Sequence, residues 1–344
     1  MLNGCFTAIV TPFAGAEVDY EGMDSLVDYQ IENGITGILA VGTTGESPAL
    51  SWEEHNALIK RIADRTRGRC LCIAGTGSNN TQEALLATEH ARDAGADAVL
   101  LVDPYYNGPS SLEIRREYIE PIAEAFPDLT IIPYIIPGRT GAKTLPEDIA
   151  LLNRKFKNVN TVKEATGDLD NMRRTRACCG DSFSILSGDD ALTFAMMTDS
   201  RIGAAGVISV LSNIVPQAVS RFIAHLQAGD FEEAGRLNDK LAPLFGLVTV
   251  TTAEATPLGE VTCRARNPLA LKTLMSILGL PSGGCRRPLG KMTRNGLEKV
   301  LTAARQVQND APEVFNPLAE WFNVDVAERL SNPAHWEGLA YEDY

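Results

Sequence analysis

The sequence is poor in the residue patterns that most hydrolases and dinucleotide enzymes need. It has four histidines in 344 residues, no two of them four positions apart, and it contains neither H-E-x-x-H nor a Cys/His cluster at zinc spacing. The G-x-S-x-G elbow, the G-x-x-x-x-G-K-[ST] phosphate loop and the G-x-G-x-x-G fingerprint are absent as well. The sequence therefore gives little reason to expect a metal-dependent hydrolase, a serine hydrolase, a nucleotide hydrolase or a dinucleotide-dependent oxidoreductase. No metal site is expected.

Basic charge is also in short supply. The chain has 31 Lys and Arg against 44 Asp and Glu, which gives a net charge of −13. A nucleic-acid partner is not expected, because phosphate contacts need a basic face. A small anionic substrate stays open, because one local lysine or arginine can outweigh the net charge.

Paired cysteine motifs and long apolar runs are missing too. The seven cysteines include no C-x-x-C pair, which is typical of reduced thiols in a reducing compartment. The first residues lack the basic and apolar regions of a signal peptide. No apolar run approaches the ~20 residues that span a bilayer. These absences predict a cytoplasmic protein without a membrane segment.

What the chain does contain is a regular alternation of short apolar runs with amphipathic segments. Runs of four to six residues without polar alternation suit strands buried on both faces of a parallel sheet. The predicted strands are Phe6–Val10, Gly37–Val41, Cys70–Ala74, Ala98–Val102, Thr130–Ile135, Val159–Lys163, Phe183–Leu186 and Gly206–Val210. The predicted helices are Glu21–Glu32, Trp52–Arg67, Gln82–Ala94, Leu112–Phe126, Pro146–Phe156, Leu169–Cys178, Ala191–Thr198 and Ile214–Ala228. Capping patterns begin at Ser51, Asn80 and Ser187, and the adjacent Asp189 and Asp190 are expected to cap a helix.

Eight strand–helix pairs predict an α/β fold, a (β/α)8 TIM barrel over residues 1–229, with an open doubly wound sheet as the competitor. Residues 230–309 are expected to form a C-terminal helical appendage, with helices at Phe231–Val248, Ala265–Leu278 and Thr293–Asn309. Residues 310–344 form an aromatic, acidic tail that is either disordered or docked on the body or on a neighbouring subunit.

Polar residues with chemical potential gather where the predicted strands end, which is the catalytic face of such a barrel. Hydroxyls and backbone NH groups of the loop 42–46 can donate hydrogen bonds to a carboxylate. A tight turn alone would also explain the two glycines of this loop. Lys163 ends an apolar strand and either reaches solvent or serves as a nucleophile. Partial burial lowers an amine pKa, and a neutral amine attacks a ketone to form a Schiff base. Hydroxyls of Tyr134, Thr43 and Tyr106 can then move protons without histidine or metal.

A family resemblance rests on eight motifs that occur in order between about residues 3 and 300. The sequence resembles the 4-hydroxy-tetrahydrodipicolinate (dihydrodipicolinate) synthases of the pyruvate-dependent class I aldolase superfamily, which also holds N-acetylneuraminate lyase. That resemblance implies a (β/α)8 barrel that condenses pyruvate with L-aspartate 4-semialdehyde in the diaminopimelate route to lysine. It implies no cofactor beyond a covalent imine on Lys163. The motifs are AIVTPF, VGTTGES, IAGTGSNNT, DPYYNGPS, YIIPGRTG, VKEATGD, SGDDA and GVISV.

The resemblance also implies roles for individual side chains. Lys163 would form the Schiff base, Tyr134 would shuttle protons over the imine, and Thr43 would relay them to Tyr106 of a neighbouring subunit. Further residues would bind substrate: Thr44 the pyruvate carboxylate, Arg139 the carboxylate of the aldehyde, and Gly188 and Ile208 the wall of the pyruvate pocket.

A homotetramer of two tight dimers, and feedback inhibition by L-lysine, are implied as well. The inhibitor would bind beside a dimer interface, although the same residues can equally cap and pack helices. This cleft would be made by Ser47, Trp52, His55, Asn79, Glu83 and Tyr105.

The motif PGRTG separates the synthases from the sialic acid lyases, which lack its arginine. Departures from the family pattern are Ile135, where asparagine is usual, and Asp103, where threonine is common. The alternatives are a sibling aldolase that acts on another aldehyde and a non-catalytic barrel that binds a small molecule. The intact set of Lys163, Tyr134, Thr43, Tyr106 and Arg139 favours an active synthase.

Overall fold

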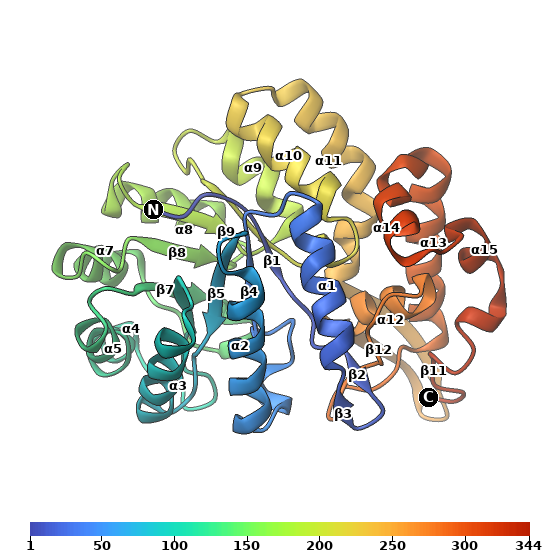
Figure 1. Ribbon diagram of the computed structural model, residues 1–344, viewed down its shortest axis with the longest axis horizontal. Coiled ribbons are helices and arrows are strands. Elements are labelled where there is room, and N and C mark those ends of the chain that lie inside the picture. The colour runs from blue at the N-terminus through green and yellow to red at the C-terminus, as the bar shows by residue number, and fades with distance from the viewer.

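Eight parallel strands close into a barrel in the computed structural model, which describes residues 1–344 (Figure 1). The first strand pairs with both the last strand and the second one, so the sheet has no free edge. The predicted barrel is confirmed and the open sheet is excluded. The strands are β1 (Gly4–Ala8), β4 (Gly37–Ala40), β5 (Leu71–Gly75), β6 (Ala98–Val102), β7 (Thr130–Ile135), β8 (Thr161–Glu164), β9 (Ser184–Ser187) and β10 (Gly206–Ser209).

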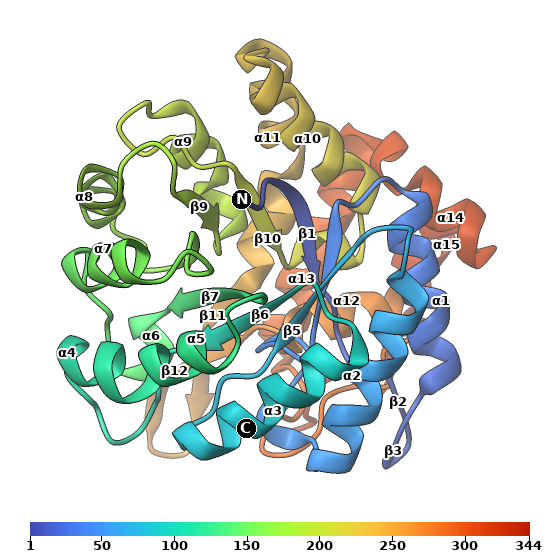
Figure 2. The same cartoon turned by 60° about the vertical axis from the view of Figure 1, so that its left-hand side comes forward.

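Helices cover the outside of the barrel, as the predicted alternation requires (Figure 2). The predicted helix 112–126 is interrupted by a π-helical stretch, Ile114–Ile119. The helices are α1 (Tyr20–Glu32), α2 (Trp52–Thr66), α3 (Thr81–Ala94), α4 (Ser111–Glu113), α5 (Glu120–Ala125), α7 (Pro146–Lys155), α8 (Leu169–Cys179), α9 (Thr193–Thr198) and α10 (Pro216–Ala228).

The helix starts agree only in part with the predicted capping patterns. Ser51 forms the expected capping box with Glu54. At 187–190 the cap is Asp189, whose side chain accepts from the Ala191 NH. The expectation that Asp190 is also a cap is wrong, because its buried carboxylate accepts from the Val210 and Leu211 NH groups and joins the ends of two strands.

The core has two parts, one inside the barrel and one between the barrel and its helices. The inner cluster includes Phe6, Leu39, Ile73, Leu186 and Ile208, which the pleat of successive strands turns inward. Glycines close the seam between β1 and β10: a Cβ on Gly206 would lie 1.9 Å from the Gly4 carbonyl oxygen.

Residues 230–309 are not wholly helical, and this corrects the sequence analysis. A two-stranded antiparallel hairpin, β11 (Thr249–Thr256) and β12 (Gly259–Arg266), follows α11 (Phe231–Phe245). The two residues between these strands, Pro257 and Leu258, form the hairpin turn. In β11 buried and exposed residues alternate with period two, and threonine favours a strand. The expected helix 265–278 therefore begins later, as α12 (Leu269–Leu278), and α13 (Arg294–Asp310) follows it.

The tail contains two short helices, α14 (Asn316–Phe322) and α15 (Val326–Ser331), that pack against the same chain (Figure 1). The Tyr29 ring of α1 lies 5.1 Å from the ring of Phe322 and 6.0 Å from that of Trp321. The Arg305 guanidinium lies 5.4 Å from the centre of the Trp336 ring. Docking on the body, rather than disorder, describes this segment. Nowhere in the chain is there a helix with the length and apolarity to cross a membrane.

Candidate active site

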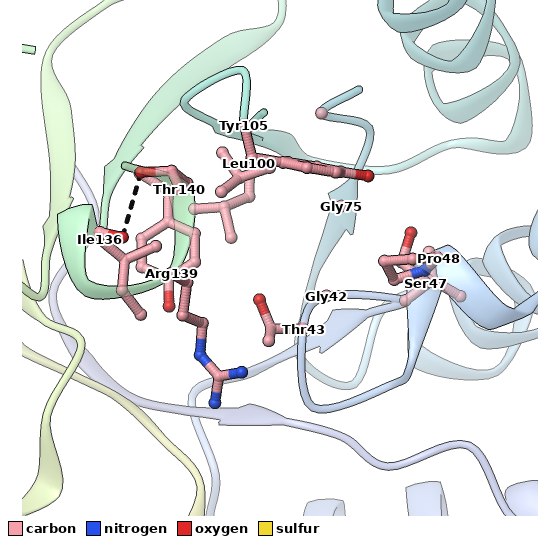
Figure 3. Close-up of a pocket in the computed structure, with 14 residues that line it drawn as sticks. Gly42, Thr43, Ser47, Pro48, Gly75, Leu100, Tyr105, Ile136, Arg139 and Thr140 are labelled. Atoms are coloured by element: carbon pink, nitrogen blue, oxygen red, sulfur yellow. Dashed lines mark hydrogen bonds between the residues drawn. The ribbon is translucent and has the colours of Figure 1, made fainter. Parts of the chain in front are cut away.

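A pocket of about 220 Å³ opens at the carboxyl ends of β4 to β7 (Figure 3). Its lining brings together loops that are far apart in the sequence, as expected for the C-terminal face of a barrel. Figure 3 shows the Thr43 hydroxyl and the Arg139 side chain on the same side of this pocket. The lining includes residues from three predicted sets. Thr43 and Tyr134 are predicted proton carriers, Arg139 is a predicted substrate binder, and Ser47 and Tyr105 belong to the predicted lysine cleft.

Lys163 lies on β8 directly opposite Tyr134 on β7. Its side chain is buried, with the residue 4% exposed, and its Nζ lies 4.3 Å from the centre of the Tyr134 ring. No carboxylate lies within ion-pair distance of this amine. Burial lowers the pKa of Lys163 to about 7, the charge of Asp190 opposes that shift, and the charge of Arg139 adds to it. A large fraction of the amine is therefore neutral, and nucleophilic, at neutral pH.

Tyr134 supplies a phenol that stays protonated beside this amine. Burial raises the pKa of Tyr134 to about 12, while the positive charge of Arg139 and the nearby Thr43 hydroxyl oppose the shift. A neutral phenol can donate a proton to a developing alkoxide and receive one back. The predicted pairing of Lys163 with a hydroxyl-bearing neighbour is thus realised in the geometry of two adjacent strands.

Gly188 gives the Lys163 side chain its room. A Cβ at this position would lie 3.1 Å from Lys163 Cε and 2.9 Å from the Cβ of Ala165. The space over the lysine therefore depends on a residue without a side chain. Ile208 is buried in the inner cluster together with Tyr134, so it walls this part of the barrel.

The loop after β4 is held in an unusual backbone conformation. Val41 has φ +46° and Glu46 has φ +57°, values that are rare outside glycine and costly for a β-branched side chain. Gly75 allows the close approach, because a Cβ there would lie 2.7 Å from the Val41 carbonyl oxygen. Thr43 and Thr44 lie between these two residues, so the loop conformation sets where their backbones lie.

A buried ion pair, which the sequence analysis missed, holds the far end of this loop. Lys272 of α12 donates to Glu46 Oε1 at 2.7 Å and to the Thr11 carbonyl at 2.9 Å. The Arg286 NH donates to the other oxygen of Glu46 at 2.8 Å. The signal was present in the sequence, since Lys272 is the one charge in the apolar segment LALKTLMSIL.

Thr44 and Arg139, the two predicted carboxylate binders, meet at a third residue that was also missed. Asn267 Nδ2 donates to Thr44 Oγ1 at 2.9 Å, and Arg139 Nη2 donates to the Asn267 carbonyl at 2.9 Å. Arg139 lies on the short helix α6 (Pro137–Thr140), beside the end of β12 (Figure 2). Burial lowers the pKa of Arg139, and the neighbouring charge of Arg266 adds to the effect.

Tyr106 does not line the pocket of its own chain. It is 94% exposed and has φ +86°, so its ring extends from a loop tip into solvent. Tyr105, its neighbour, lines the pocket. The relay of three hydroxyls is therefore incomplete in one chain, and a Tyr106 that serves a site would serve another copy.

The six residues of the predicted lysine cleft are only partly assembled in one chain. Trp52 and His55 pack edge to face at 5.1 Å, and Asn79 Oδ1 accepts from the Tyr105 NH at 2.8 Å. Glu83 already has a partner within the chain, because its carboxylate accepts from the Ser78 hydroxyl at 2.5 Å. It therefore does not complete a capping box with Asn80, whose side chain accepts from the Gln82 NH instead.

Asp103, one of the departures from the family pattern, is a buried structural carboxylate. It accepts from the Thr144 NH at 3.0 Å and from the Thr144 hydroxyl at 2.7 Å, which ties the end of β6 to the segment before α7. Burial raises the pKa of Asp103 to about 6, and its hydrogen bonds to Thr144 oppose the shift. No group of three or more His, Cys, Asp or Glu side chains is placed to hold a metal ion.

Comparison with known proteins gives one consistent family. The model of the dihydrodipicolinate synthetase family matches residues 1–307. The 4-hydroxy-tetrahydrodipicolinate synthase of Syntrophus aciditrophicus is 41% identical over 300 residues, which cover 87% of this chain and 96% of that protein.

Solved structures agree with the sequence comparison. Chloride-inhibited dihydrodipicolinate synthase from Acinetobacter baumannii, complexed with pyruvate, is 36% identical with a TM-score of 0.80 and covers 89% of this chain and 99% of its own. The enzyme from Cyanidioschyzon merolae with lysine bound is 35% identical with a TM-score of 0.80 and covers 89% of this chain and 98% of its own. The region beyond residue 307 lies outside the family match.

Proposed function

The chain belongs to the dihydrodipicolinate synthetase family, and we propose that it condenses pyruvate with L-aspartate 4-semialdehyde to 4-hydroxy-tetrahydrodipicolinate, the activity for which its relatives are named. It is a Schiff-base-forming lyase of the lysine and diaminopimelate pathway. The observation that carries this proposal is the buried, unpaired Lys163 amine against the Tyr134 phenol.

The chemistry starts at Lys163 Nζ. The neutral amine attacks the pyruvate ketone, and the resulting carbinolamine loses water to give a protonated imine. The imine draws electrons from the methyl group, which loses a proton and becomes the nucleophilic carbon of an enamine. That carbon attacks the aldehyde, and a proton reaches the new alkoxide. The α-amine of the aldehyde substrate then attacks the imine carbon, which closes the ring and releases the Lys163 amine. Tyr134 is close to the amine and stays protonated, so it is suited to carry these protons with Thr43.

Two cationic or polar groups bind the carboxylates in this proposal. Thr44, with backbone NH groups of its loop, holds the pyruvate carboxylate, and the Arg139 guanidinium meets the carboxylate of the aldehyde. Their link through Asn267 supports a shared geometry for the two substrates. Gly188 and Ile208 shape the pyruvate end of the pocket. The proposed reaction uses no cofactor other than the covalent imine.

Covalent trapping tests the proposal directly. Borohydride added with pyruvate should reduce the imine and leave a stable adduct on the peptide that contains Lys163. Lys163→Arg should remove the adduct, because a guanidinium stays protonated. An adduct on another lysine, or none in the wild type, contradicts the assignment. A coupled assay with a panel of aldehydes separates the synthase from a sibling aldolase, and a pyruvate adduct without turnover of any aldehyde would indicate a binding protein.

Assembly into a homotetramer of two tight dimers is part of the proposal, because Tyr106 is exposed in one chain and its hydroxyl would complete the relay in a partner. Mixing Tyr106→Phe with Lys163→Arg should restore part of the activity in hybrid dimers, since one site then holds both intact groups. No recovery after confirmed subunit exchange would count against Tyr106 crossing the interface.

L-lysine is proposed as an inhibitor, supported by the relative that was solved with lysine bound. The cleft would include Ser47 and Tyr105 at the pocket, with Trp52, His55, Asn79 and Glu83 beside it. Millimolar lysine should lower turnover, and Glu83→Ala should abolish that inhibition with little change in uninhibited turnover. Unchanged wild-type activity in lysine would contradict it. A cytoplasmic location is proposed as well, supported by seven free thiols.

A further inference from the structure

Asn267 forms hydrogen bonds with both Thr44 and Arg139, although it lies 223 positions after Thr44 and 128 after Arg139. It follows β12, and its NH donates to the Val248 carbonyl at 2.9 Å, which fixes the backbone at the base of the hairpin. The preceding Arg266 donates from Nη1 to the Gly138 carbonyl at 2.8 Å. The base of the hairpin is thus tied to the helix that carries Arg139 and to the loop that carries Thr44.

The side-chain amide of Asn267 is placed to orient the Thr44 hydroxyl. Its Nδ2 donates to Thr44 Oγ1, while its Oδ1 is buried and has no hydrogen-bond partner in the chain. A buried acceptor without a hydrogen-bond partner carries a free-energy cost. A cost of this kind is expected where geometry is kept for function.

We propose that Asn267 is a positioning residue that holds Thr44 as a hydrogen-bond donor toward the pyruvate carboxylate. A hydroxyl has one proton and two lone pairs. Because the Asn267 amide donates to the Thr44 oxygen, the hydroxyl proton is left free to point toward an anion. The backbone carbonyl of Asn267 accepts from the Arg139 guanidinium and restrains it. One residue therefore sets the distance between the two groups that are proposed to bind carboxylates. This inference rests on the proposed function and refines the pyruvate end of the site.

The test measures how much pyruvate gives half-maximal borohydride trapping at Lys163, which needs no aldehyde. Asn267→Ala should raise this concentration about tenfold, the loss expected for one hydrogen bond to a charged group. In a Thr44→Val background the same replacement should have little further effect, because the hydroxyl through which it acts is gone. A merely structural role would lower the trapped amount and the melting temperature without moving the half-saturation point.

Asn267→Asp supplies a sharper signature. An ionised carboxylate can only accept, so it draws the Thr44 proton away from pyruvate, whereas a protonated one can donate as the amide does. The half-saturating pyruvate concentration of this variant should fall as the pH is lowered toward the carboxyl pKa, relative to wild type at each pH. The matched control is Asn295→Ala, since Asn295 Nδ2 also contacts the hairpin, at Glu254 and Ala253, and the wild-type value is expected there.

The outcomes separate this inference from the function on which it rests. A wild type that forms no adduct overturns the proposed function and this role together. A wild type that traps pyruvate, with Asn267→Ala unchanged in half-saturation, overturns the role of Asn267 alone. An equal rise in the wild-type and Thr44→Val backgrounds shows that Asn267 does not act through Thr44, which also overturns it.

Discussion

The chain has two buried lysines in similar surroundings, Lys163 in the barrel and Lys272 beneath the loop after β4, and only Lys272 has a carboxylate partner. Each Nζ lies 4.3 Å from the centre of an aromatic ring, that of Tyr134 for Lys163 and that of Phe13 for Lys272. Burial lowers the pKa of both. They differ in their acceptors, because Lys272 has a carboxylate at 2.7 Å and Lys163 has none within ion-pair distance.

Burial lowers the pKa of a lysine, and a neighbouring carboxylate opposes that lowering. The two lysines differ because only Lys272 has such a carboxylate. For Lys272 the carboxylate of Glu46, at 2.7 Å, opposes the lowering of the pKa, and the pair holds the loop after β4 in place. Lys163 has no carboxylate within ion-pair distance, so burial favours its neutral form, as the proposed nucleophile requires. A burial pattern alone does not distinguish the two lysines; the neighbouring carboxylate does.

The largest effect expected from breaking this contrast is on activity. Lys163→Met should lower turnover by about a thousandfold or more, because no other amine can form the imine. Its stability should not fall, since the change removes an unpaired buried amine and keeps an unbranched apolar side chain. Turnover and urea unfolding of the same preparation measure both. A variant that keeps a tenth of the activity would contradict the assigned nucleophile.

The converse change should act on stability. Lys272→Met leaves Glu46 buried without its cation, which should lower the free energy of unfolding by about 3–5 kcal/mol. The double variant Glu46→Gln with Lys272→Met should recover part of that loss, because neither charge is then stranded. Urea unfolding of both single variants and the double variant gives the coupling. Additive losses would show that the pair is not the origin of the effect.

The pH dependence of imine formation sharpens the contrast at Lys163. The folded-state pKa of about 7 lies below that of a free lysine. The fraction of Lys163 that carries a neutral amine therefore increases as the pH rises through 7. The initial rate of borohydride trapping should therefore rise between about pH 6 and 8 and level off above, at saturating pyruvate. An amine with an ordinary pKa would instead give a rate that still climbs at pH 9.

The smallest effect concerns Asp103, a buried carboxylate with hydroxyl and NH partners but no cation. Its folded-state pKa of about 6 lies above the unfolded value, so the unfolded chain releases its proton first and stability falls as the pH rises from about 4 to 6. Asp103→Asn should abolish this loss, which for a pKa raised from 3.8 to about 6 amounts to roughly 3 kcal/mol by pH 8. Denaturant unfolding at pH 4.5 and pH 8 checks it, and a pH-independent difference between the two proteins would contradict it.

Local pattern was enough to predict the barrel and the residues at its strand ends. Apolar runs of one strand's length are a short-range signal; Lys163 and Tyr134 lie at the ends of such runs, and Arg139 lies in the short segment that follows one. The hairpin was missed because its strands are partly polar and follow a helix. The contacts of Asn267 with Thr44 and of Lys272 with Glu46 were missed because these partners lie more than two hundred residues apart; the lone charge in the apolar segment LALKTLMSIL marks Lys272 as unusual but does not name its partner. The side chain of Tyr106 was found, but one chain does not bring it to its own pocket.

The contact between Thr44 and Asn267 spans 223 positions, and this separation has a consequence for the chain during its synthesis. At translation rates of about 5–20 residues per second, Thr44 exists for roughly 10–45 s before Asn267 is added. Throughout that time the strained loop has neither its amide partner nor the ammonium of Lys272. A chain that stops between residues 210 and 266 contains every barrel strand and still lacks both. In such a chain the loop after β4 has its strained backbone without the two contacts that hold it in the complete chain.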